Sequence, residues 1–194
     1  MFYHAVQFQV VSFGPADWVT ALRAMLTAVL AAMLIPSAPA VGANAVVIAS
    51  VAAALDGVDG WLARRTRTAS AFGARFDMET DALLILVLSA LAWKSGKTGA
   101  WVLASGVMRY AFVAAAAIWP WLHEPLEPSR RRQTICVVQV VTLIAALLPS
   151  VGPAMASTIA AAGLAALAWS FLVDILWLWR LRASRPLFSS STRH

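Results

Sequence analysis

Four aspartates stand close together in the stretch from Asp56 to Asp81, which reads DGVDGWLARRTRTASAFGARFDMETD. Asp56 and Asp59 are three residues apart, and Asp77 and Asp81 are four apart, so in two helices each pair shares one face. If these two faces oppose each other, up to four negative charges meet in one site. Like charges at such short range resist joint ionisation, so the cluster needs cations to neutralise it.

Divalent metal ions are the cations that best suit these side chains. The candidate ligands are oxygen atoms only, and no Cys or His stands nearby, which favours a hard ion, Mg²⁺ or Mn²⁺, over Zn²⁺. A pair of such ions is typical of phosphate chemistry. The small residues Gly60, Ala63 and Gly73 leave space for a ligand beside the backbone, and Arg64 is placed to meet a phosphate.

This stretch resembles the signature of the CDP-alcohol phosphotransferases without a mismatch at its eight defined positions, which are Asp56, Asp59, Gly60, Ala63, Arg64, Gly73, Asp77 and Asp81. The resemblance implies a six-helix membrane enzyme that moves a phosphoalcohol from a CDP-alcohol to an acceptor hydroxyl and releases CMP. A weaker similarity lies upstream. The segment PADWVTALR, which ends at Arg23, resembles the family pattern Pro-x-Asn-x-Leu-Thr-x-x-Arg, with Asp17 and Val19 as its two departures.

The resemblance also implies roles for these residues. Asp56, Asp59 and Asp77 would hold two metal ions, and Asp81 would bind the second ion or act as the general base, the role that the family gives to its fourth aspartate. The nucleotide would lie against Asp56, Gly60, Ala63, Arg64 and Gly73. The stretch lacks the Pro after the third aspartate and the Lys after the fourth that glycerophosphate-using members carry, so it does not predict the acceptor.

The composition indicates an integral membrane protein. Of 194 residues, 61% are hydrophobic and only 12% are charged, whereas soluble proteins average about 25% charged residues. The length suits one membrane domain over residues 1–194 with six spans of roughly 20 residues each. The single cysteine, Cys136, excludes an internal disulfide. The net charge of +6 comes without a basic and aromatic surface, so no nucleic-acid partner is expected.

We expect an all-α integral membrane fold, with six transmembrane helices around a cytosol-facing polar cavity. The expected spans are 17–35, 42–67, 73–93, 99–119, 133–148 and 154–181. Residues 1–16 fit either an interfacial segment or an unstructured lead-in, and residues 182–194 fit a flexible tail. A signal peptide ending near Ala40 is the alternative for the first span, but its leader is too long and holds only Arg23 as a basic residue.

Lys and Arg are distributed unequally between the two sides of these spans. With a cytosolic amino terminus, only Lys94 and Lys97 fall outside, whereas eleven basic residues fall inside: Arg64, Arg65, Arg67, Arg75, Arg130, Arg131, Arg132, Arg180, Arg182, Arg185 and Arg193. By the positive-inside rule, both termini and the aspartates then face the cytosol. We therefore expect a multi-pass protein of the cell (inner) membrane, with the bilayer as a partner.

Several charged residues have two interpretations. Arg109 lies within the fourth span and would bind the acceptor or form a salt bridge, with Asp174 as the suggested partner. The run Arg130, Arg131 and Arg132 would bind an acceptor phosphate or anionic lipid head groups. Glu79 lies off the helical face that its neighbouring aspartates share and is not expected to be a ligand. The aspartates themselves could instead be helix-end carboxylates paired with Arg64, Arg65 and Arg75.

The expected reaction is transfer of a phosphatidyl group from CDP-diacylglycerol to a small polar or phosphorylated alcohol, as a step of phospholipid biosynthesis. A soluble CDP-alcohol with a lipid hydroxyl acceptor is the reversed arrangement. A non-catalytic transporter or scaffold that binds cations is the alternative from another class. Relatives are often dimers, so a homodimer is compatible with the resemblance.

Overall fold

The computed structural model describes the backbone of residues 15–35, 42–66, 71–119, 121 and 129–184, and the side chains of these residues except 15–16, 59–66, 71–72 and 182–184. This part of the chain forms six α-helices and one short 3-10 helix and contains no strand. The elements are α1 (Pro15–Ala32), α2 (Ala43–Thr66), α3 (Ala71–Lys94), η1 (Ala100–Leu103), α4 (Ala104–Ile118), α5 (Arg130–Leu147) and α6 (Pro153–Ser184). The all-helical expectation is confirmed for these residues.

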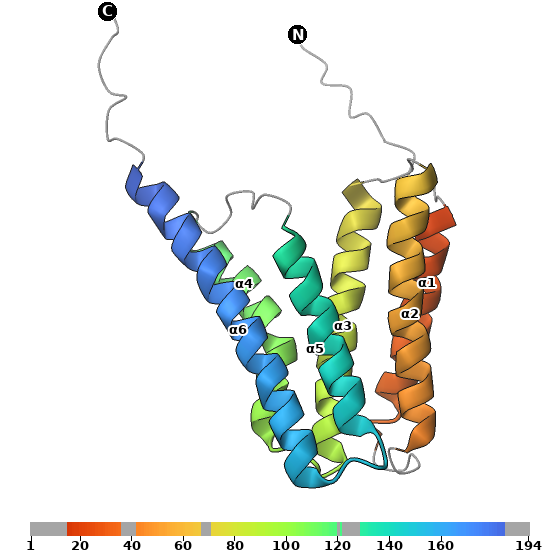
Figure 1. The fold of residues 1–194 in the computed structure, drawn as a ribbon. Coiled ribbons are helices and arrows are strands. Elements are labelled where there is room, and N and C mark those ends of the chain that lie inside the picture. Colours follow the sequence, from red (N-terminus) through yellow and green to blue (C-terminus); the bar gives the residue numbers. More distant parts are fainter. Residues whose placement is uncertain (1–14, 36–41, 67–70, 120, 122–128, 185–194) are drawn as a thin grey trace, which may run out of the picture.

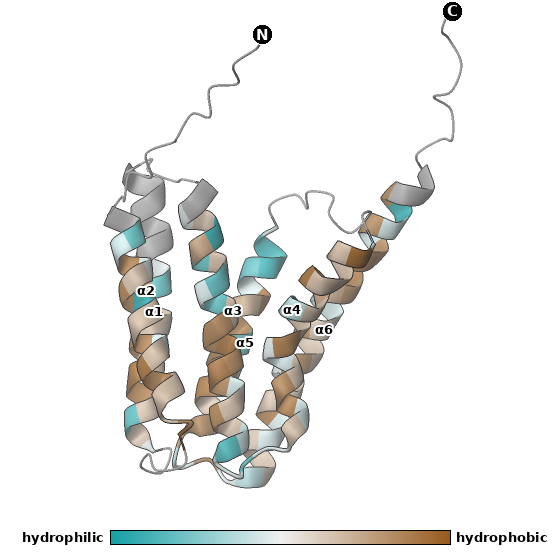
Figure 2. Cartoon of the chain, turned by 180° about the vertical axis from the view of Figure 1, so that it is seen from behind, coloured by the Kyte–Doolittle hydropathy of each residue, from teal (hydrophilic) through white to brown (hydrophobic). Residues whose placement is uncertain are grey.

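The helices lie side by side in one bundle (Figure 1). Helix α1 begins and α6 ends at the same end of the bundle, and α6 leans away from α1, α2 and α3 toward that end. Hydrophilic residues gather on α3 and α5 at this same end, whereas the middle of the bundle is largely hydrophobic (Figure 2). Polar residues of α3 and α5 therefore mark this end of the bundle.

Two helical stretches in the described residues are long and apolar enough to cross a membrane. They are Ala100–Ile118 and Pro153–Leu181, with mean hydropathies of 1.6 and 2.0, and Ala43–Val58 is a shorter apolar stretch. Six spans therefore stay a prediction. The helix boundaries also differ from expectation at α5, which begins at Arg130 rather than Gln133, so the arginine run forms the first turn of a helix.

Small residues bring neighbouring helices close together. Ala45, Ala49 and Ala52 recur at helical spacing on α2, and all three are fully buried. The same spacing recurs on α6 with Ala156, Ala160 and Gly163. A Cβ atom at Gly163 would come within 2.3 Å of Thr142 Oγ1 on α5. Close approach of this kind is typical of helix packing in membranes, where small residues let backbones meet, so the α6 face with Gly163 serves helix packing.

Two lysines tie helices together at the opposite end of the bundle. Lys94, the last residue of α3, donates hydrogen bonds from Nζ to the carbonyl oxygens of Met33 (2.6 Å) and Ile35 (2.9 Å), just beyond α1. Lys97 donates to the carbonyl oxygen of Leu148, beyond α5, at 2.5 Å. Cations stabilise the carbonyl groups that a helix C-terminus leaves without intrahelical partners. The last residue of α3 therefore holds the end of α1, and the segment after α3 holds the end of α5.

Gly106→Ala should destabilise the bundle, because a Cβ atom at Gly106 would lie 2.4 Å from the backbone Cα of Leu86 on α3. Backbone cannot move aside as a flexible side chain can, so α3 and α4 must separate, at a cost of about 1–3 kcal/mol. Thermal unfolding of the purified protein in detergent measures this loss. Gly152→Ala is the matched control, since nothing lies within 4 Å of its added Cβ; equal melting temperatures for both variants would contradict the close approach.

Candidate functional site

Carboxylates from two helices converge at the polar end of the bundle. Asp56 extends from α2, and Asp77 and Asp81 extend from α3, where they stand one helical turn apart. One oxygen from each of these carboxylates lies within 4.8 Å of one from each of the others. The sequence predicted this convergence from the spacing of the aspartates. The backbone of Asp59 belongs to α2, but its side chain lies outside the described residues.

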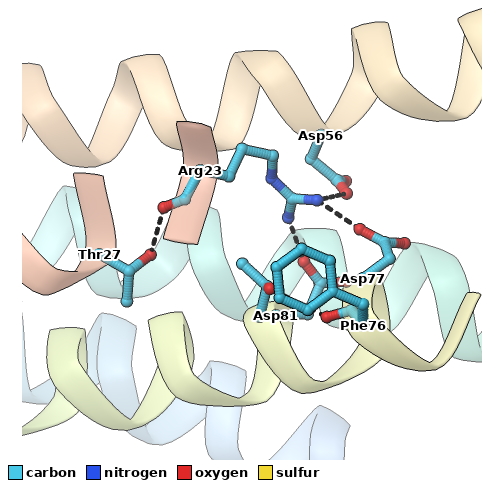
Figure 3. A network of polar contacts seen from close by, with 7 residues as sticks. Arg23, Thr27, Asp56, Phe76, Asp77 and Asp81 are labelled. Carbon is cyan, nitrogen blue, oxygen red and sulfur yellow. Dashed lines mark hydrogen bonds and ion pairs between the residues drawn. The ribbon is translucent and has the colours of Figure 1, made fainter. Parts of the chain in front are cut away.

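A single arginine of α1 contacts all three carboxylates (Figure 3). Arg23 Nη1 lies 3.0 Å from Asp56 Oδ1 and 2.5 Å from Asp77 Oδ1, and Nη2 forms an ion pair with Asp81 Oδ1. The Arg23 side chain is only 1% exposed, whereas those of the three aspartates are 25–40% exposed. The guanidinium is therefore buried beneath carboxylates that reach toward solvent.

Arg23 was not predicted to lie in the site. It belongs to the segment that resembles the family pattern upstream, and the cations expected at the aspartates were metal ions or Arg64, Arg65 and Arg75. A signal was nevertheless present in α1, because Thr20, Arg23 and Thr27 recur every three to four residues in a largely apolar helix. All three are buried, with exposures of 2%, 1% and 0%. A polar stripe of this kind indicates the face that turns toward other polar groups.

A cavity of about 290 Å³ adjoins the carboxylates. Its walls combine Arg23, the three aspartates and Gly57 with a side formed mainly by α5, where Gln133 is polar and Cys136, Val137, Val140 and Val141 are apolar. Gly73 stands on α3 one turn before Asp77 and is partly buried. The side chains of Gly60, Ala63 and Arg64 lie outside the described residues, so their predicted contacts with a nucleotide stay predictions.

The donor set fits a hard divalent cation. The converging atoms are carboxylate oxygens only, they come from two helices, and they border a cavity that a ligand can enter. Carboxylate oxygens are the ligands that Mg²⁺ and Mn²⁺ prefer, and Mg²⁺ is bound in proteins by one or two carboxylates together with substrate phosphates. Three acidic side chains beside an open space therefore suit a cation that is shared with a phosphorylated ligand.

Arg109 pairs with Glu79 rather than with Asp174. Arg109 Nη2 lies 2.5 Å from Glu79 Oε1, and the two side chains are 27% and 56% exposed. The suggested partnership with Asp174 is wrong because α4 packs beside α3, where Glu79 points away from the face of Asp77 and Asp81. Glu79 thus stands outside the carboxylate cluster, in line with its predicted angular offset.

Asp174 pairs instead with the arginine run at the start of α5. It forms an ion pair with Arg131 Nη2 and lies 3.5 Å from Arg132 Nη1. Arg131 Nη1 also donates a hydrogen bond to the carbonyl oxygen of Ser170, one turn earlier on α6, at 3.4 Å. Two members of the run therefore join α5 to α6. Arg130 is exposed and precedes Gln133 by three residues, so it shares the α5 face that lines the cavity.

The family model described as CDP-alcohol phosphatidyltransferase matches residues 14–175. This match covers all of α1 to α5 and most of α6, including the three converging aspartates and Arg23. The comparisons found no match among curated proteins and none among solved structures.

Mn²⁺ should stabilise the protein through the carboxylate cluster. Changing Asp56, Asp77 or Asp81 singly to Asn removes a charged ligand, and the apparent Mn²⁺ affinity should fall by about tenfold or more. Even the loss of a residue that only orients a metal ligand lowers metal affinity by about 10–100-fold. The measurement is the shift in melting temperature during Mn²⁺ titration. Glu79→Gln is the control, because Glu79 sits on the same helix but pairs with Arg109. Equal losses in Glu79→Gln and Asp77→Asn would argue against a metal site at this cluster.

Proposed function

The chain belongs to the CDP-alcohol phosphatidyltransferase family, and on this basis we propose that it transfers a phosphatidyl group from CDP-diacylglycerol to the hydroxyl of a small polar or phosphorylated alcohol, with release of CMP. The observation that carries the proposal is the convergence of Asp56, Asp77 and Asp81 on one cavity. Carboxylates placed in this way serve a reaction at a diphosphate, because a diphosphate and an acidic cluster can be held together only by shared cations.

We propose that Asp56, Asp59 and Asp77 hold two Mg²⁺ or Mn²⁺ ions, with Asp81 next to them. When bound, these ions neutralise the diphosphate and stabilise the charge that develops during displacement at phosphorus. The nucleotide half of the donor lies against Gly60, Ala63, Arg64 and Gly73 in this proposal. The partial exposure of Asp56 and Asp77, at 32% and 40%, supports access from the cavity.

Asp81 is the proposed general base. Its carboxylate takes the proton from the acceptor hydroxyl as that oxygen attacks the phosphorus bonded to the transferred alcohol. A new phosphorus–oxygen bond forms, the bond that joins this phosphorus to the bridging oxygen of the diphosphate breaks, and CMP leaves with that oxygen. Asp81 is the least exposed of the three carboxylates, at 25%, which supports a position beneath the reacting groups.

The acceptor side of the proposal involves the arginines at the polar end, Arg109, Arg130, Arg131 and Arg132. Among these, Arg130 has the strongest support, because it is exposed and shares the cavity face of α5, while the other three form ion pairs with Glu79 or Asp174. A guanidinium binds phosphate through two parallel hydrogen bonds. We therefore favour a phosphorylated polyol as the acceptor over serine or another uncharged alcohol.

The membrane arrangement belongs to the same proposal. Six spans with both termini and the carboxylates on the cytosolic side of the inner membrane would place the site where CDP-linked substrates are made. The polar ends of α3 and α5 and the apolar middle of the bundle support this arrangement (Figure 2). A lipid donor would then keep its acyl chains in the bilayer while its diphosphate reaches the carboxylates. A homodimer is compatible with this membrane arrangement.

Purified protein incubated with CDP-diacylglycerol, Mn²⁺ and a panel of acceptors should release CMP. Asp81→Asn should lower the rate by about 100-fold or more, the usual contribution of a general base, and chelation of divalent ions should abolish it. Glu79→Gln should retain activity because its side chain lies outside the cluster. No CMP with any acceptor or with soluble CDP-alcohols would overturn the proposal and favour a cation-binding transporter or scaffold.

Arg130→Gln should raise the KM for a phosphorylated acceptor by roughly tenfold or more, because a charge-assisted hydrogen bond contributes about 1.5–3 kcal/mol. The KM for CDP-diacylglycerol should stay unchanged in the same variant. Initial-rate kinetics with one substrate varied at a time separate the two. Arg132→Gln is the comparison, since that side chain faces Asp174; an equal rise in acceptor KM would show that the effect does not depend on the cavity face.

A further inference from the structure

Arg23 and a divalent cation require the same three carboxylates. The guanidinium contacts Asp56 and Asp77 through Nη1 and Asp81 through Nη2. These residues also form the group whose oxygen atoms lie within 4.8 Å of one another. A metal ion binds carboxylate oxygens at about 2.0–2.1 Å, inside the space that the guanidinium nitrogens fill. Both cations cannot occupy this position together, because two positive charges a few ångströms apart repel strongly in a partly buried site.

Arg23 also supplies the positive charge that the three carboxylates need when no metal ion is bound. Three carboxylates at this separation would repel one another, and burial of unpaired charge is costly. The arginine side chain is 1% exposed and depends on these partners equally. The guanidinium and the carboxylates therefore each lower the free-energy cost of burying the other's charge. Only the addition of a stronger cation can release the arginine from this arrangement without leaving the carboxylates uncompensated.

We propose that Arg23 is a placeholder cation: it holds Asp56, Asp77 and Asp81 together in the metal-free protein and withdraws from them when divalent cations bind. The cavity that adjoins the cluster has a volume of about 290 Å³, and Arg23 is one of its lining residues, so the long side chain has space to move without unfolding α1. Arg23 is thus a positioning residue that competes with the metal. The inference rests on the metal site of the proposed function and adds to it a residue that opposes metal binding.

The test compares Mn²⁺ binding by the unchanged protein and by Arg23→Gln, with free Mn²⁺ followed by electron paramagnetic resonance. A competitor that is removed leaves a tighter site, so Arg23→Gln should bind Mn²⁺ at least about tenfold more tightly, which corresponds to about 1.4 kcal/mol. The metal-free variant should melt at a lower temperature, and Mn²⁺ should raise its melting temperature by more than it raises that of the unchanged protein. A purely structural arginine would give the reverse, because a distorted site binds metal more weakly.

Arg109→Gln is the matched control for general electrostatics. It removes a guanidinium that pairs with Glu79, on α3 between two of the carboxylates, and it should leave Mn²⁺ affinity nearly unchanged. Arg23→Lys is a second variant in case Arg23→Gln does not fold. Lysine keeps the charge but lacks the planar fork that spans three carboxylates, so its Mn²⁺ affinity should lie between those of the other two proteins.

The outcomes separate this inference from the proposed function. Equal or weaker Mn²⁺ binding by Arg23→Gln, or by Arg23→Lys where that is the variant that folds, overturns the placeholder role and leaves the metal site standing. Equal tightening in Arg109→Gln also overturns it, because the effect would then reflect net charge alone. Absence of Mn²⁺ binding by the unchanged protein overturns both the placeholder role and the proposed metal site.

Discussion

Mutual neutralisation of charge is the constraint on which this end of the molecule depends. Three carboxylates from two helices lie within 4.8 Å of one another, and the guanidinium of a third helix contacts them all. In an apolar bundle neither side of this arrangement is tolerable alone. The relative positions of α1, α2 and α3 are therefore coupled, since a shift of one helix along another would leave a buried charge without its partner.

The other ion pairs repeat this principle at neighbouring helix contacts. Arg109 and Glu79 join α4 to α3, and Arg131 and Arg132 join α5 to α6 through Asp174. These arginines are 27–32% exposed, so water weakens their contribution to stability. Their main effect is on register, because apolar helix faces built from alanine and leucine can pack in several alignments whereas an ion pair selects one. Ion pairs thus set the alignment of the helices at the polar end of the bundle, and the packing of apolar side chains sets it elsewhere.

The sequence predicted the features that depend on local geometry. Helical periodicity alone brings Asp77 beside Asp81, and the expected opposition of two polar helix faces brings Asp56 near them. It did not predict the place of Arg23, because the face that α1 turns inward is decided by its packing against α2 and α3. The partner of Arg109 was missed for the same reason: two carboxylates, Glu79 and Asp174, were available, and only the arrangement of the helices selects between them.

Lys94 and Lys97, at the end of α3 and just after it, have a mechanical consequence. Their hydrogen bonds attach the ends of α1 and α5 to this part of the chain, whereas Arg23, Asp81 and Gln133 stand on α1, α3 and α5 toward the other end of the bundle. The lysine contacts lie far from the carboxylates, so a slight tilt of one of these helices about them displaces its polar end most. The ion pairs of Arg23 with Asp56, Asp77 and Asp81 oppose that tilt at the end where the displacement is largest.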